Sequence, residues 1–600
     1  MSKPWFEERP AVLDRELNSF KNIGINFEID EPLRQKGVLR IKATIDPKSK
    51  VFNLKIDQDK LVLSIVYPDS YPFFRPQVFA DNLNLPRHQN PLEKNLCLLG
   101  RMTIEWDSQQ TAAGLIRDQL PKVLEKAIIT DQNAIRNDPT EQAEPVSEFY
   151  SRAEHPVLFD PSCIPEADLE SNAPKLLASL SIGIGKEKFF PTRLAVLETN
   201  VISNGEKHEA IKPILEIFTS KFKGQLYRVP EPPPGDANQM FPWLRKLLKD
   251  SGQALKISNN TFRVNGEVTI KDVTGLCFEE EKEKGVTGYG WLFHIEIICK
   301  SKPEKGMRQV IKAVQLYARS SDPKPLSHNV RAPKLAPLAE KKVSIAGLGA
   351  LGGFIAIELA RSGIGFLDLL DNDAIEPAST IRWPMGLMAV GINKAIILKG
   401  FIDMQYPSTK VDCYNWLLGT FQVNSSDDTQ INFRESEILD KFFENSSLVI
   451  DATAEFGVHH LLSQEAQKRG VPYISLYATP GAYGGSIMRQ IPYKTGCWSC
   501  FTHMENDGSL LKLNEDVTGL IQPPGCGDIT FTGASVDLQQ ISLMATKLAI
   551  STLCEGRVEG YPTVDWHIAR VNLFDEKGEF LVPGWITYDL PVHPTCYYCN

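Results

Sequence analysis

Four cysteines near the end of the chain have the spacing of metal ligands. They form two C-x-x-C pairs, Cys497 with Cys500 and Cys596 with Cys599. Four thiolates make a closed tetrahedral zinc site, and a closed site of this kind is structural rather than catalytic. The alternative, a thioredoxin-like redox pair, lacks the βαβ setting that such a pair needs. The pattern therefore predicts a structural Zn²⁺ that holds the C-terminus to its domain.

A glycine-rich segment predicts a phosphate-binding turn. Its G-x-G-x-x-G glycines are Gly347, Gly349 and Gly352. An apolar strand at residues 343–346 precedes them, and an apolar helix at about residues 350–361 follows. Glycines let the backbone approach a phosphate, which the helix N-terminus then faces. A second strand, residues 365–370, ends at Asp371, where an acid reaches the ribose hydroxyls in a βαβ nucleotide-binding unit.

The charged residues after this unit indicate which nucleotide it binds. They are Asp371, Asp373, Arg382 and Lys394. An NAD-dependent oxidoreductase has no need for an arginine and a lysine just beyond the ribose acid. An enzyme that attacks the α-phosphate of ATP does, because negative charge builds on that phosphate and on the departing pyrophosphate. The pattern favours ATP with Mg²⁺ over NAD.

This order of glycines, D-x-D, arginine and lysine resembles the ThiF, MoeB and ubiquitin-activating superfamily. The resemblance implies that Asp371 binds ribose and that Arg382 and Lys394 hold phosphates. It also implies a structural zinc held by the paired C-x-x-C motifs, and a homodimer.

Two further ATP-site residues are expected from the same resemblance. Relatives usually have a second aspartate, serving the metal-bound ATP, where this chain has Ala454. Asp451 or Glu455 can take that task, and Asp451 is preferred because it lies at the carboxyl end of a sheet strand. Many relatives also use an arginine from upstream of the first strand, for which Arg319 is the candidate and Arg331 the competitor.

Cys526 is a candidate nucleophile. It lies in a segment rich in proline and glycine, ahead of a long helix expected from about residue 534 to 554. Backbone N–H groups and the helix dipole can stabilise a thiolate in such a place. In ubiquitin-activating relatives a cysteine in this setting receives the acyl group from the adenylate, and the resemblance gives Cys526 that role.

A second candidate nucleophile, Cys97, lies in the N-terminal part. A meander of strands, a proline-rich aromatic segment, the H-x-N element ending at Asn90, Cys97, Trp106 and a helix at residues 111–129 follow one another. This order resembles the ubiquitin-conjugating fold. The resemblance implies that Cys97 carries a thioester and that Asn90 steadies the oxyanion during transfer to an amine, which suits a thiolate and an amide donor. Gln89 departs from the usual proline.

The expected architecture is a multidomain α/β and α+β protein. Residues 1–140 are predicted to form a ubiquitin-conjugating-like α+β domain, with a helix at residues 12–23 and strands at residues 37–45, 51–56 and 61–66. Residues 141–335 are predicted to form a linker and a middle α/β domain. Residues 336–600 are predicted to form a Rossmann-like ThiF-type adenylation domain with the catalytic-cysteine loop and the zinc site.

The composition restricts the class of protein. With 42% hydrophobic and 23% charged residues the chain is an ordinary globular one, and its net charge of −9 argues against a general nucleic-acid binder. No run of 18 apolar residues and no signal-peptide core occur, so neither a membrane span nor secretion is expected and the location is predicted to be cytoplasmic. Eleven cysteines in 600 residues are too few for a disulfide scaffold.

Together the two ends resemble bacterial CBASS anti-phage fusions of a conjugating and an activating module. The resemblance implies that the chain adenylates a protein C-terminus, that of a cGAS-like nucleotidyltransferase, passes it from Cys526 to Cys97, and joins it to a target amine. Fusion would make the transfer effectively intramolecular. Three alternatives stay open: a sulfur-carrier adenylyltransferase of the MoeB or ThiF type, an NAD-dependent oxidoreductase, and a non-catalytic module that only binds a carrier protein.

Overall fold

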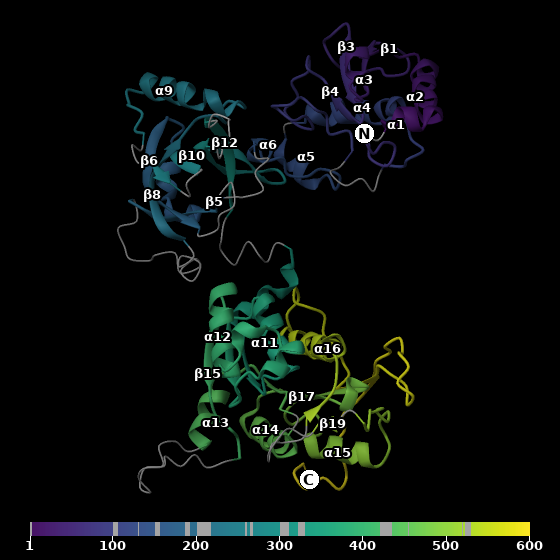
Figure 1. The fold of residues 1–600 in the computed structure, drawn as a ribbon, viewed down its shortest axis with the longest axis vertical. Coiled ribbons are helices and arrows are strands. Elements are labelled where there is room, and N and C mark those ends of the chain that lie inside the picture. Colours follow the sequence, from purple (N-terminus) through teal and green to yellow (C-terminus); the bar gives the residue numbers. More distant parts are fainter. Residues whose placement is uncertain are drawn as a thin grey trace, which may run out of the picture. The chain divides into compact units, whose positions relative to one another are not determined.

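A computed structural model describes residues 3–599 of the chain with internal gaps. The residues outside the description are 1–2, 100–105, 130, 151–156, 186–192, 201–217, 258–260, 264–267, 301–310, 322–330, 420–434, 454, 519, 522–529 and 600. The chain divides into two compact units, Met1–Glu206 with Ile217–Asp322 and Lys207–Glu216 with Pro323–Asn600 (Figure 1). Among the described residues no helix is both long and apolar enough to cross a membrane.

The N-terminal part of the first unit is an antiparallel sheet covered by helices. The strands, in sheet order, are β1 (Asn26–Ile29), β2 (Arg40–Ile45), β3 (Leu61–Val66) and β4 (Gln77–Phe79). The helices are α1 (Trp5–Glu8), α2 (Pro10–Ile23), α3 (Glu31–Arg34), α4 (Ala112–Ala127) and α5 (Gln132–Asn137). Helix α4 begins where the Thr111 hydroxyl accepts a hydrogen bond from the Gly114 N–H, 3.2 Å away, a typical N-cap. Alternate residues of β2 and β3 are buried, as expected for strands with one face on a core.

One expected strand of this domain is wrong. Residues 51–56 form turns and irregular chain rather than a strand, and β1 takes a place in the sheet instead. The local cause is a turn at Asp46, whose carboxylate accepts the Lys48 N–H at 2.9 Å, followed by Asn53 with a positive φ of 42°. Asx turns and left-handed residues break an extended strand.

The middle part is built mainly of strands, where a mixed α/β domain was expected. Its strands are β5 (Val157–Leu158), β6 (Lys175–Gly185), β7 (Leu194–Thr199), β8 (Phe218–Arg228), β9 (Phe262–Arg263), β10 (Val268–Glu283), β11 (Val286–Lys300) and β12 (Ile311–Ser321). They follow the order β11-β12-β5-β7-β6-β8-β10-β9, and β10 also pairs with β11, so the sheet closes on itself. The one long helix described here is α9 (Met240–Asp250); the short α6 (Ser147–Tyr150) precedes β5, and the short α7 (Glu166–Leu169) lies between β5 and β6.

The second unit is a doubly wound sheet. Its strands, in sheet order, are β15 (Lys410–Tyr414), β14 (Phe366–Leu370), β13 (Lys342–Ala346), β16 (Leu448–Asp451), β17 (Tyr473–Ala478), β18 (Gly484–Gln490), β21 (Ile568–Asn572) and β22 (Ile586–Tyr588). The first five are parallel and the last three antiparallel. Its main helices are α11 (Gly352–Arg361), α12 (Lys394–Gln405), α13 (Glu435–Phe443), α14 (Phe456–Arg469), α15 (Trp498–Asn506) and α16 (Ser535–Leu553). The Rossmann-like fold expected for this region is confirmed.

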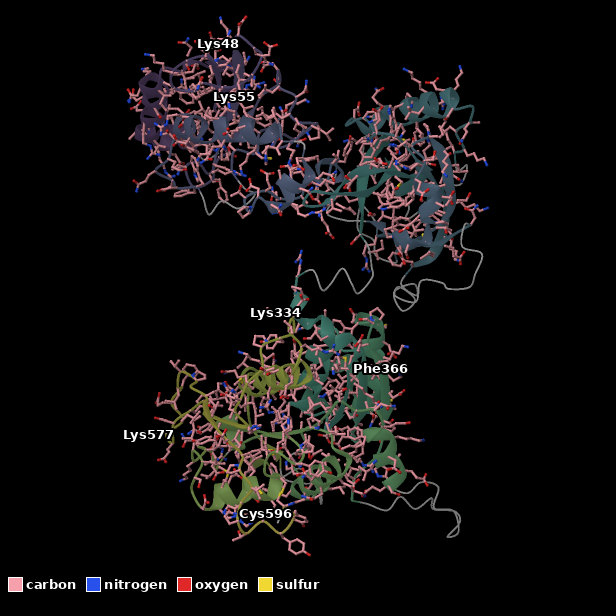
Figure 2. The ribbon with its side chains drawn as sticks, turned by 180° about the vertical axis from the view of Figure 1, so that it is seen from behind. Lys48, Lys55, Lys334, Phe366, Lys577 and Cys596 are labelled. Carbon is pink, nitrogen blue, oxygen red and sulfur yellow. The ribbon has the colours of Figure 1, made fainter. Side chains whose placement is uncertain are left out.

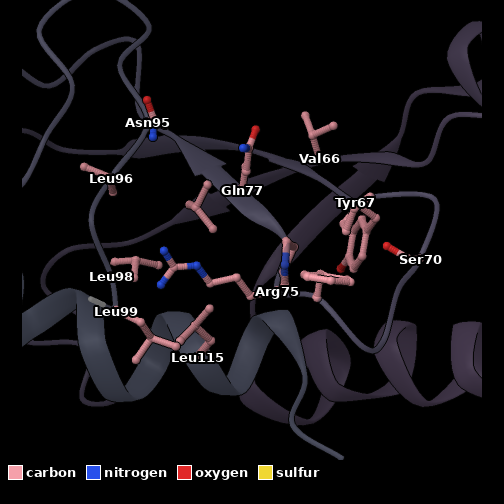
Figure 3. Close-up of a pocket in the computed structure, with 14 residues that line it drawn as sticks. Val66, Tyr67, Ser70, Arg75, Gln77, Asn95, Leu96, Leu98, Leu99 and Leu115 are labelled. Carbon is pink, nitrogen blue, oxygen red and sulfur yellow. The ribbon is translucent and has the colours of Figure 1, made fainter. Parts of the chain in front are cut away.

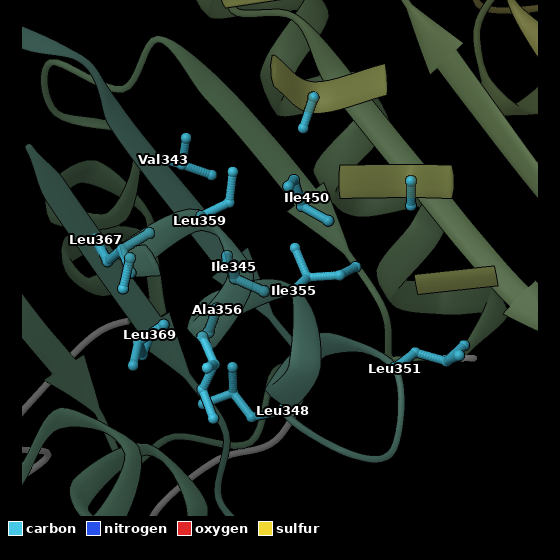
Figure 4. Packing of buried hydrophobic residues seen from close by; sticks show 14 of the residues in the cluster. Val343, Ile345, Leu348, Leu351, Ile355, Ala356, Leu359, Leu367, Leu369 and Ile450 are labelled. Atoms are coloured by element: carbon cyan, nitrogen blue, oxygen red, sulfur yellow. The ribbon is translucent and has the colours of Figure 1, made fainter. Parts of the chain in front are cut away.

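A continuous apolar core holds the nucleotide-binding βαβ unit together. Ile345 on β13, Ile355 on α11 and Leu369 on β14 are fully buried in one cluster (Figure 4). Helix α16 contributes to the same cluster through residues such as Leu538 and Ile541. Because β13 lies between β14 and β16, its carboxyl end is at the point where the strand order reverses, the usual ligand site of such sheets.

Candidate functional site

The turn after β13 has the backbone that a phosphate site needs. Gly347 has a positive φ of 79°, and a Cβ on it would lie 2.6 Å from the Ala452 carbonyl carbon. A Cβ on Gly352 would lie 1.9 Å from the Gly347 carbonyl oxygen. A Cβ on Gly349, by contrast, would meet nothing within 4 Å. Two of the three glycines thus allow close packing of the turn, while Gly349 faces open space beside the N-terminus of α11.

Asp371 lies at the end of β14 and is bound to this turn. One of its carboxylate oxygens accepts the Leu348 N–H at 2.7 Å, and the other accepts the Asp373 N–H at 2.8 Å. Burial raises the pKa of Asp371 above its usual range, although Lys394 and the two backbone N–H groups act to lower it. Asp371 therefore lies next to the glycine turn, and its contact with ribose stays a prediction.

Lys394 and Arg382 lie on the segment that follows β14. The Lys394 ammonium is 2.6 Å from the Asp373 carboxylate and 3.9 Å from that of Asp371. Burial lowers the pKa of the Arg382 guanidinium. The cation Lys394 and the acids Asp371 and Asp373 therefore gather at the carboxyl end of the parallel strands, beside the glycine turn, and Arg382 lies on the same segment.

Two residues that shape this segment were missed from the sequence. The Trp383 indole N–H donates to the Leu348 carbonyl at 2.7 Å, which ties the residue after Arg382 to the glycine turn. Asn393 caps α12 through its side-chain oxygen, and its NH₂ group donates to the Asp371 carbonyl at 3.0 Å. The asparagine directly before a predicted helix was an available N-cap signal, whereas the tryptophan contact has no local signature.

Asp451, expected to serve the metal-bound ATP, is enclosed instead. It is fully buried, and one oxygen lies 2.9 Å from His459 Nδ1 and accepts the Tyr473 hydroxyl at 3.0 Å. The other oxygen accepts the N–H and the hydroxyl of Thr453, at 3.0 and 2.7 Å. A carboxylate with both oxygens engaged and no exposed surface has no direct place for a metal ion, so the structure corrects this expectation.

Glu455 is the exposed acid of the same loop. It is the N-cap of α14, where its carboxylate lies 3.4 Å from the Gly457 N–H. Ala454, the position of the usual second aspartate, lies outside the described residues. In the described part of this loop Glu455 is the carboxylate that solvent can reach.

Arg319, expected to reach the ATP site, belongs to another domain. It lies on β12 of the barrel, opposite Leu292, and forms an ion pair with Glu148. The expectation depended on its position upstream of the first strand in sequence, and strand pairing places Arg319 in the first unit. Arg331 is an exposed residue of the second unit, shortly before β13, and takes over as the candidate.

The four cysteines of the paired C-x-x-C motifs come together. Their sulfur atoms all lie within 4.8 Å of one another, with Cys497 and Cys596 3.6 Å apart and Cys500 and Cys599 3.7 Å apart. Zn–S bonds of about 2.3 Å at tetrahedral angles place sulfurs roughly 3.8 Å apart, so the cluster fits such an ion. Figure 2 labels Cys596, on the C-terminal segment that returns to α15. The cysteine cluster predicted from the sequence is confirmed, and it can hold a metal.

A short hairpin positions Asn90 and Cys97. The Cys97 N–H donates to the His88 carbonyl at 2.8 Å, and the Asn90 N–H donates to the Asn95 carbonyl at 2.9 Å. Gln89 forms a bridge with Leu96, and both side chains are buried. Successive side chains along a strand point to opposite faces. Asn90 follows Gln89 and Cys97 follows Leu96, so both belong to the face opposite the buried pair, the outer face. The Asn90 side-chain oxygen accepts the Leu92 N–H at 2.9 Å, which fixes the amide and leaves its NH₂ group as the donor.

His88 is clamped between two acids. Its ring nitrogens lie 3.1 Å from carboxylate oxygens of Glu141 and Glu144, and its backbone N–H donates to the Glu144 carboxylate at 2.8 Å. Burial lowers the pKa of His88, but the hydrogen bonds and charges of the two glutamates outweigh it, so the pKa is raised. The sequence offered no reason to expect an acid from the linker at this histidine.

A cavity of about 530 Å³ lies beside the Cys97 segment (Figure 3). Leu96 and Leu98, on either side of Cys97, line it together with Leu115 of α4. Figure 3 shows the Arg75 side chain extending across it toward Leu98. The lining of this cavity is mixed: leucines stand beside the polar side chains of Ser70, Gln77 and Asn95 and the Arg75 guanidinium.

Cys526, the expected acceptor of the acyl group, lies outside the described residues. The helix that was expected after it is α16, which begins at Ser535.

Two domain families match the chain. Residues 325–551 match the ThiF family, and residues 43–159 match the prokaryotic E2 family B. These matches confirm the two resemblances found in the sequence: the first range contains the glycine turn through Lys394, and the second contains Asn90 and Cys97. The chain thus combines an E1-like adenylation domain with an E2-like domain, and is an activating and conjugating enzyme.

Relatives fall into two groups by coverage. The uncharacterized protein y4oA of Sinorhizobium fredii is 27% identical over 99% of this chain and 97% of its own length. The ATP-dependent ubiquitin transferase-like protein Cap2 of Vibrio cholerae is 34% identical over 12% of this chain and 13% of its own length. Ubiquitin-like modifier-activating enzyme 5 of Caenorhabditis elegans is 24% identical over 27% of this chain and 38% of its own length.

Among solved structures, E. coli MccB with ATP is 18% identical and covers 44% of this chain and 68% of its own. The TM-score of this match is 0.32.

Proposed function

We propose that this chain, which combines an E1-like adenylation domain with an E2-like domain, is a fusion of the Cap2 type that activates the C-terminus of a protein with ATP and ligates it to an amine through two cysteine thioesters. ATP-dependent activation and conjugation in the ubiquitin-like manner follow from its two domains. The observation that carries the finer proposal is the pair of sites: a glycine turn with Asp371 and Lys394 in one unit, and Cys97 on the same hairpin face as Asn90 in the other.

The first step forms an acyl adenylate. An oxygen of the substrate's C-terminal carboxylate attacks the α-phosphorus of ATP, and pyrophosphate leaves. In this proposal Gly347, Gly349 and Gly352 admit the phosphates, and Asp371 binds the ribose. Lys394 and Arg382 neutralise charge on the α-phosphate and on the pyrophosphate.

Mg²⁺ is expected to accompany the ATP, where it would neutralise phosphate charge. Since Asp451 is enclosed, we propose that Glu455, the exposed acid of the loop after β16, faces it. Asp373, which follows β14, is a further exposed carboxylate at this edge of the sheet. Arg331 is the proposed arginine from upstream of β13.

The later steps move the acyl group between sulfurs. The Cys526 thiolate attacks the acyl carbon and AMP leaves; the Cys97 thiolate then attacks the same carbon and the Cys526 thiolate leaves. Finally a target amine attacks, the Cys97 thiolate leaves, and the amine loses a proton. The Asn90 NH₂ group is the proposed donor to the oxyanion in this last step.

The cysteine cluster is proposed to hold a structural Zn²⁺. Cys497 and Cys500 begin α15, while Cys596 and Cys599 belong to the C-terminal segment. A metal between them would attach that segment to the domain. All four positions are taken by cysteine, which leaves no open coordination position for catalysis.

The partners follow from the resemblance to CBASS fusions. We propose that the substrate is the C-terminus of a cGAS-like nucleotidyltransferase and that the enzyme works in anti-phage defence. A homodimer is proposed as well. Its support in this chain is a set of exposed apolar side chains on the segment that carries Arg382: Ile381, Leu387 and Met388 are 82%, 75% and 95% exposed, and several exposed apolar residues on one segment favour an interaction site.

The test is to trap the thioesters. The full chain, Mg-ATP and the nucleotidyltransferase are mixed, and adducts sensitive to thiols are sought on a non-reducing gel. We expect an adduct in the wild type, none in Cys526→Ala, and in Cys97→Ala an adduct on Cys526 alone. Cys413→Ala, which removes a half-buried cysteine outside both sites, is the matched control. Adducts of wild-type amount in both Cys526→Ala and Cys97→Ala would refute the relay.

The rival functions give different results. A sulfur-carrier adenylyltransferase would form its product normally in Cys97→Ala. An NAD-dependent oxidoreductase would show no ATP-pyrophosphate exchange that depends on substrate. A domain that only binds a carrier protein would form no thioester on Cys97.

A further inference from the structure

The segment that carries the conjugating cysteine, residues 87–97, is held by the middle domain at two places. At its start, Arg87 Nη1 lies 2.8 Å from the Glu281 carboxylate, near the end of β10. In its turn, Leu92 packs against Gly235, where a Cβ would lie 2.8 Å from Leu92 Cδ2. One contact is ionic and the other is apolar.

The first contact is a buried network. Arg87 also lies 3.2 Å from Glu141, and its side chain is 10% exposed. The Glu281 carboxylate accepts the Glu144 N–H at 2.9 Å and the Gly285 N–H at 2.8 Å. Because its two oxygens bind the linker and its own hairpin, Glu281 has one fixed position from which to hold Arg87.

Two linker acids connect this network to His88. Glu141 forms an ion pair with Arg87, and the Glu144 backbone N–H donates to the Glu281 carboxylate. The carboxylates of both linker glutamates flank the His88 ring. His88 has a positive φ of 61°, a conformation that needs outside support in a residue other than glycine. Its carbonyl accepts the Cys97 N–H. The position of Cys97 thus depends on a backbone conformation held by these acids.

The second contact comes from a stiff loop. Residues 230–236 contain four prolines before Gly235, and the Tyr317 hydroxyl donates to the Pro234 carbonyl at 2.9 Å. The Tyr150 hydroxyl donates to the carbonyl of Pro233 in the same loop. Gly235 is therefore presented to Leu92 by a loop anchored to the barrel. Leu92 in turn donates its N–H to the Asn90 side chain.

We propose that the middle domain is a positioning element of the conjugating site: the hairpin end of β10 and the proline loop hold residues 87–97, and so place Cys97 and Asn90 for the attack of the amine. This proposal rests on the proposed thioester function of Cys97. The positioning residues are Glu281 and Gly235, which touch neither substrate nor the reacting atoms.

The test variant is Glu281→Gln, which keeps the side chain's size and removes its charge. Glu283→Gln is the matched control, because Glu283 is an exposed acid of the same strand. In the full chain three quantities are measured: ATP-pyrophosphate exchange, single-turnover discharge of the Cys97 thioester onto free lysine over a range of lysine concentrations, and alkylation of Cys97 by iodoacetamide, read from its peptide.

We expect Glu281→Gln to lower the maximal discharge rate about tenfold or more, since small displacements of a positioned group have large effects on rate. The lysine concentration at half-maximal rate should not change, because Glu281 does not bind the amine. Exchange should stay within about twofold of the wild type, because the proposed adenylation site is in the other unit. Alkylation of Cys97 should change several-fold, and Glu283→Gln should match the wild type in all three.

Leu92→Ala tests the second contact without a change of charge, and replaces Glu281→Gln if that variant does not fold. It too should lower the maximal discharge rate. Discharge and alkylation equal to the Glu283→Gln control in the folded variants would overturn the proposal. If the wild type forms no thioester on Cys97, the proposed function fails, and the alkylation rates alone then decide the positioning role.

Discussion

Adding one methyl group to the glycine turn tests the proposed nucleotide site. A Cβ on Gly352 would lie 1.9 Å from the Gly347 carbonyl oxygen, whereas real Cβ atoms essentially never approach closer than 3.0 Å. In Gly352→Ala the turn must therefore open by the difference between 3.0 and 1.9 Å, about 1.1 Å. The opposing atom is backbone, so no side-chain rotation relieves the contact. Gly349→Ala is the matched control, because a Cβ there meets nothing within 4 Å.

The assay is ATP-pyrophosphate exchange with the protein substrate present. A displacement of about 1 Å costs on the order of 100-fold in rate, which corresponds to about 2.7 kcal/mol of transition-state stabilisation. We expect Gly352→Ala to lower kcat/KM for ATP by about this factor or more. Gly349→Ala should lower it by less than about tenfold, mainly through KM, because its methyl group would only crowd the space proposed for the phosphates.

Circular dichroism and thermal unfolding show whether each variant has folded. Wild-type exchange in a folded Gly352→Ala would refute the placement of the phosphates at this turn. A larger loss in Gly349→Ala than in Gly352→Ala would refute the argument from backbone crowding.

Three further outcomes are expected. Glu455→Gln should lower the kcat of exchange about tenfold or more and lower the unfolding temperature only slightly, because glutamine can still cap α14 through its side-chain oxygen but loses the charge. Asp451→Asn should lower the unfolding temperature more, since it disturbs buried hydrogen bonds worth about 1–3 kcal/mol; equal exchange in Glu455→Gln and wild type would contradict the assignment. By elemental analysis, Cys500→Ser should lose the one Zn²⁺ bound per chain, whereas Cys413→Ser should keep it. One zinc per chain in both variants would exclude the cysteine cluster as the zinc site. The pKa of His88 is raised in the folded state, so its stabilising charge is fully present below about pH 6.5, the unfolded-state pKa, and is lost as pH rises through the folded-state pKa. The Cys97 amide should therefore lose protection from hydrogen exchange, corrected for intrinsic rates, as pH rises. His88→Asn should abolish this dependence of protection on pH.

The elements around both sites could be predicted because their signals are local. The strand expected at residues 61–66 is β3, and the long helix expected at about residues 534–554 is α16 (Ser535–Leu553). The glycine spacing also predicted the turn at Gly347. In each case the residues that specify the structure are neighbours in sequence, so periodicity and caps suffice.

The middle domain could not be predicted because its structure depends on distant pairing. Strands β10 and β11 read as mixed apolar runs, and their closure with β12 and β5 joins residues far apart in the chain. Arg319 was misplaced for the same reason: nearness to β13 in sequence suggested the ATP site, but pairing of β12 with β11 holds it in the barrel. Glu281 and Arg87, which form an ion pair, are 194 residues apart in the chain, and no local sequence pattern predicts their contact.

The case of Asp451 shows why a correct position in the fold does not fix a residue's role. Its place at the carboxyl end of β16 is where acids of this fold meet the nucleotide, and that reasoning alone favours it. Burial decides otherwise, because its two oxygens are engaged by His459, Tyr473 and Thr453. Those bonds fix the backbone of Thr453, whose N atom would lie 2.6 Å from a Cβ on Gly347. Asp451 therefore supports the backbone against which the glycine turn packs. Our proposal accordingly gives the role of facing the metal-bound nucleotide to Glu455, an exposed acid of the same loop.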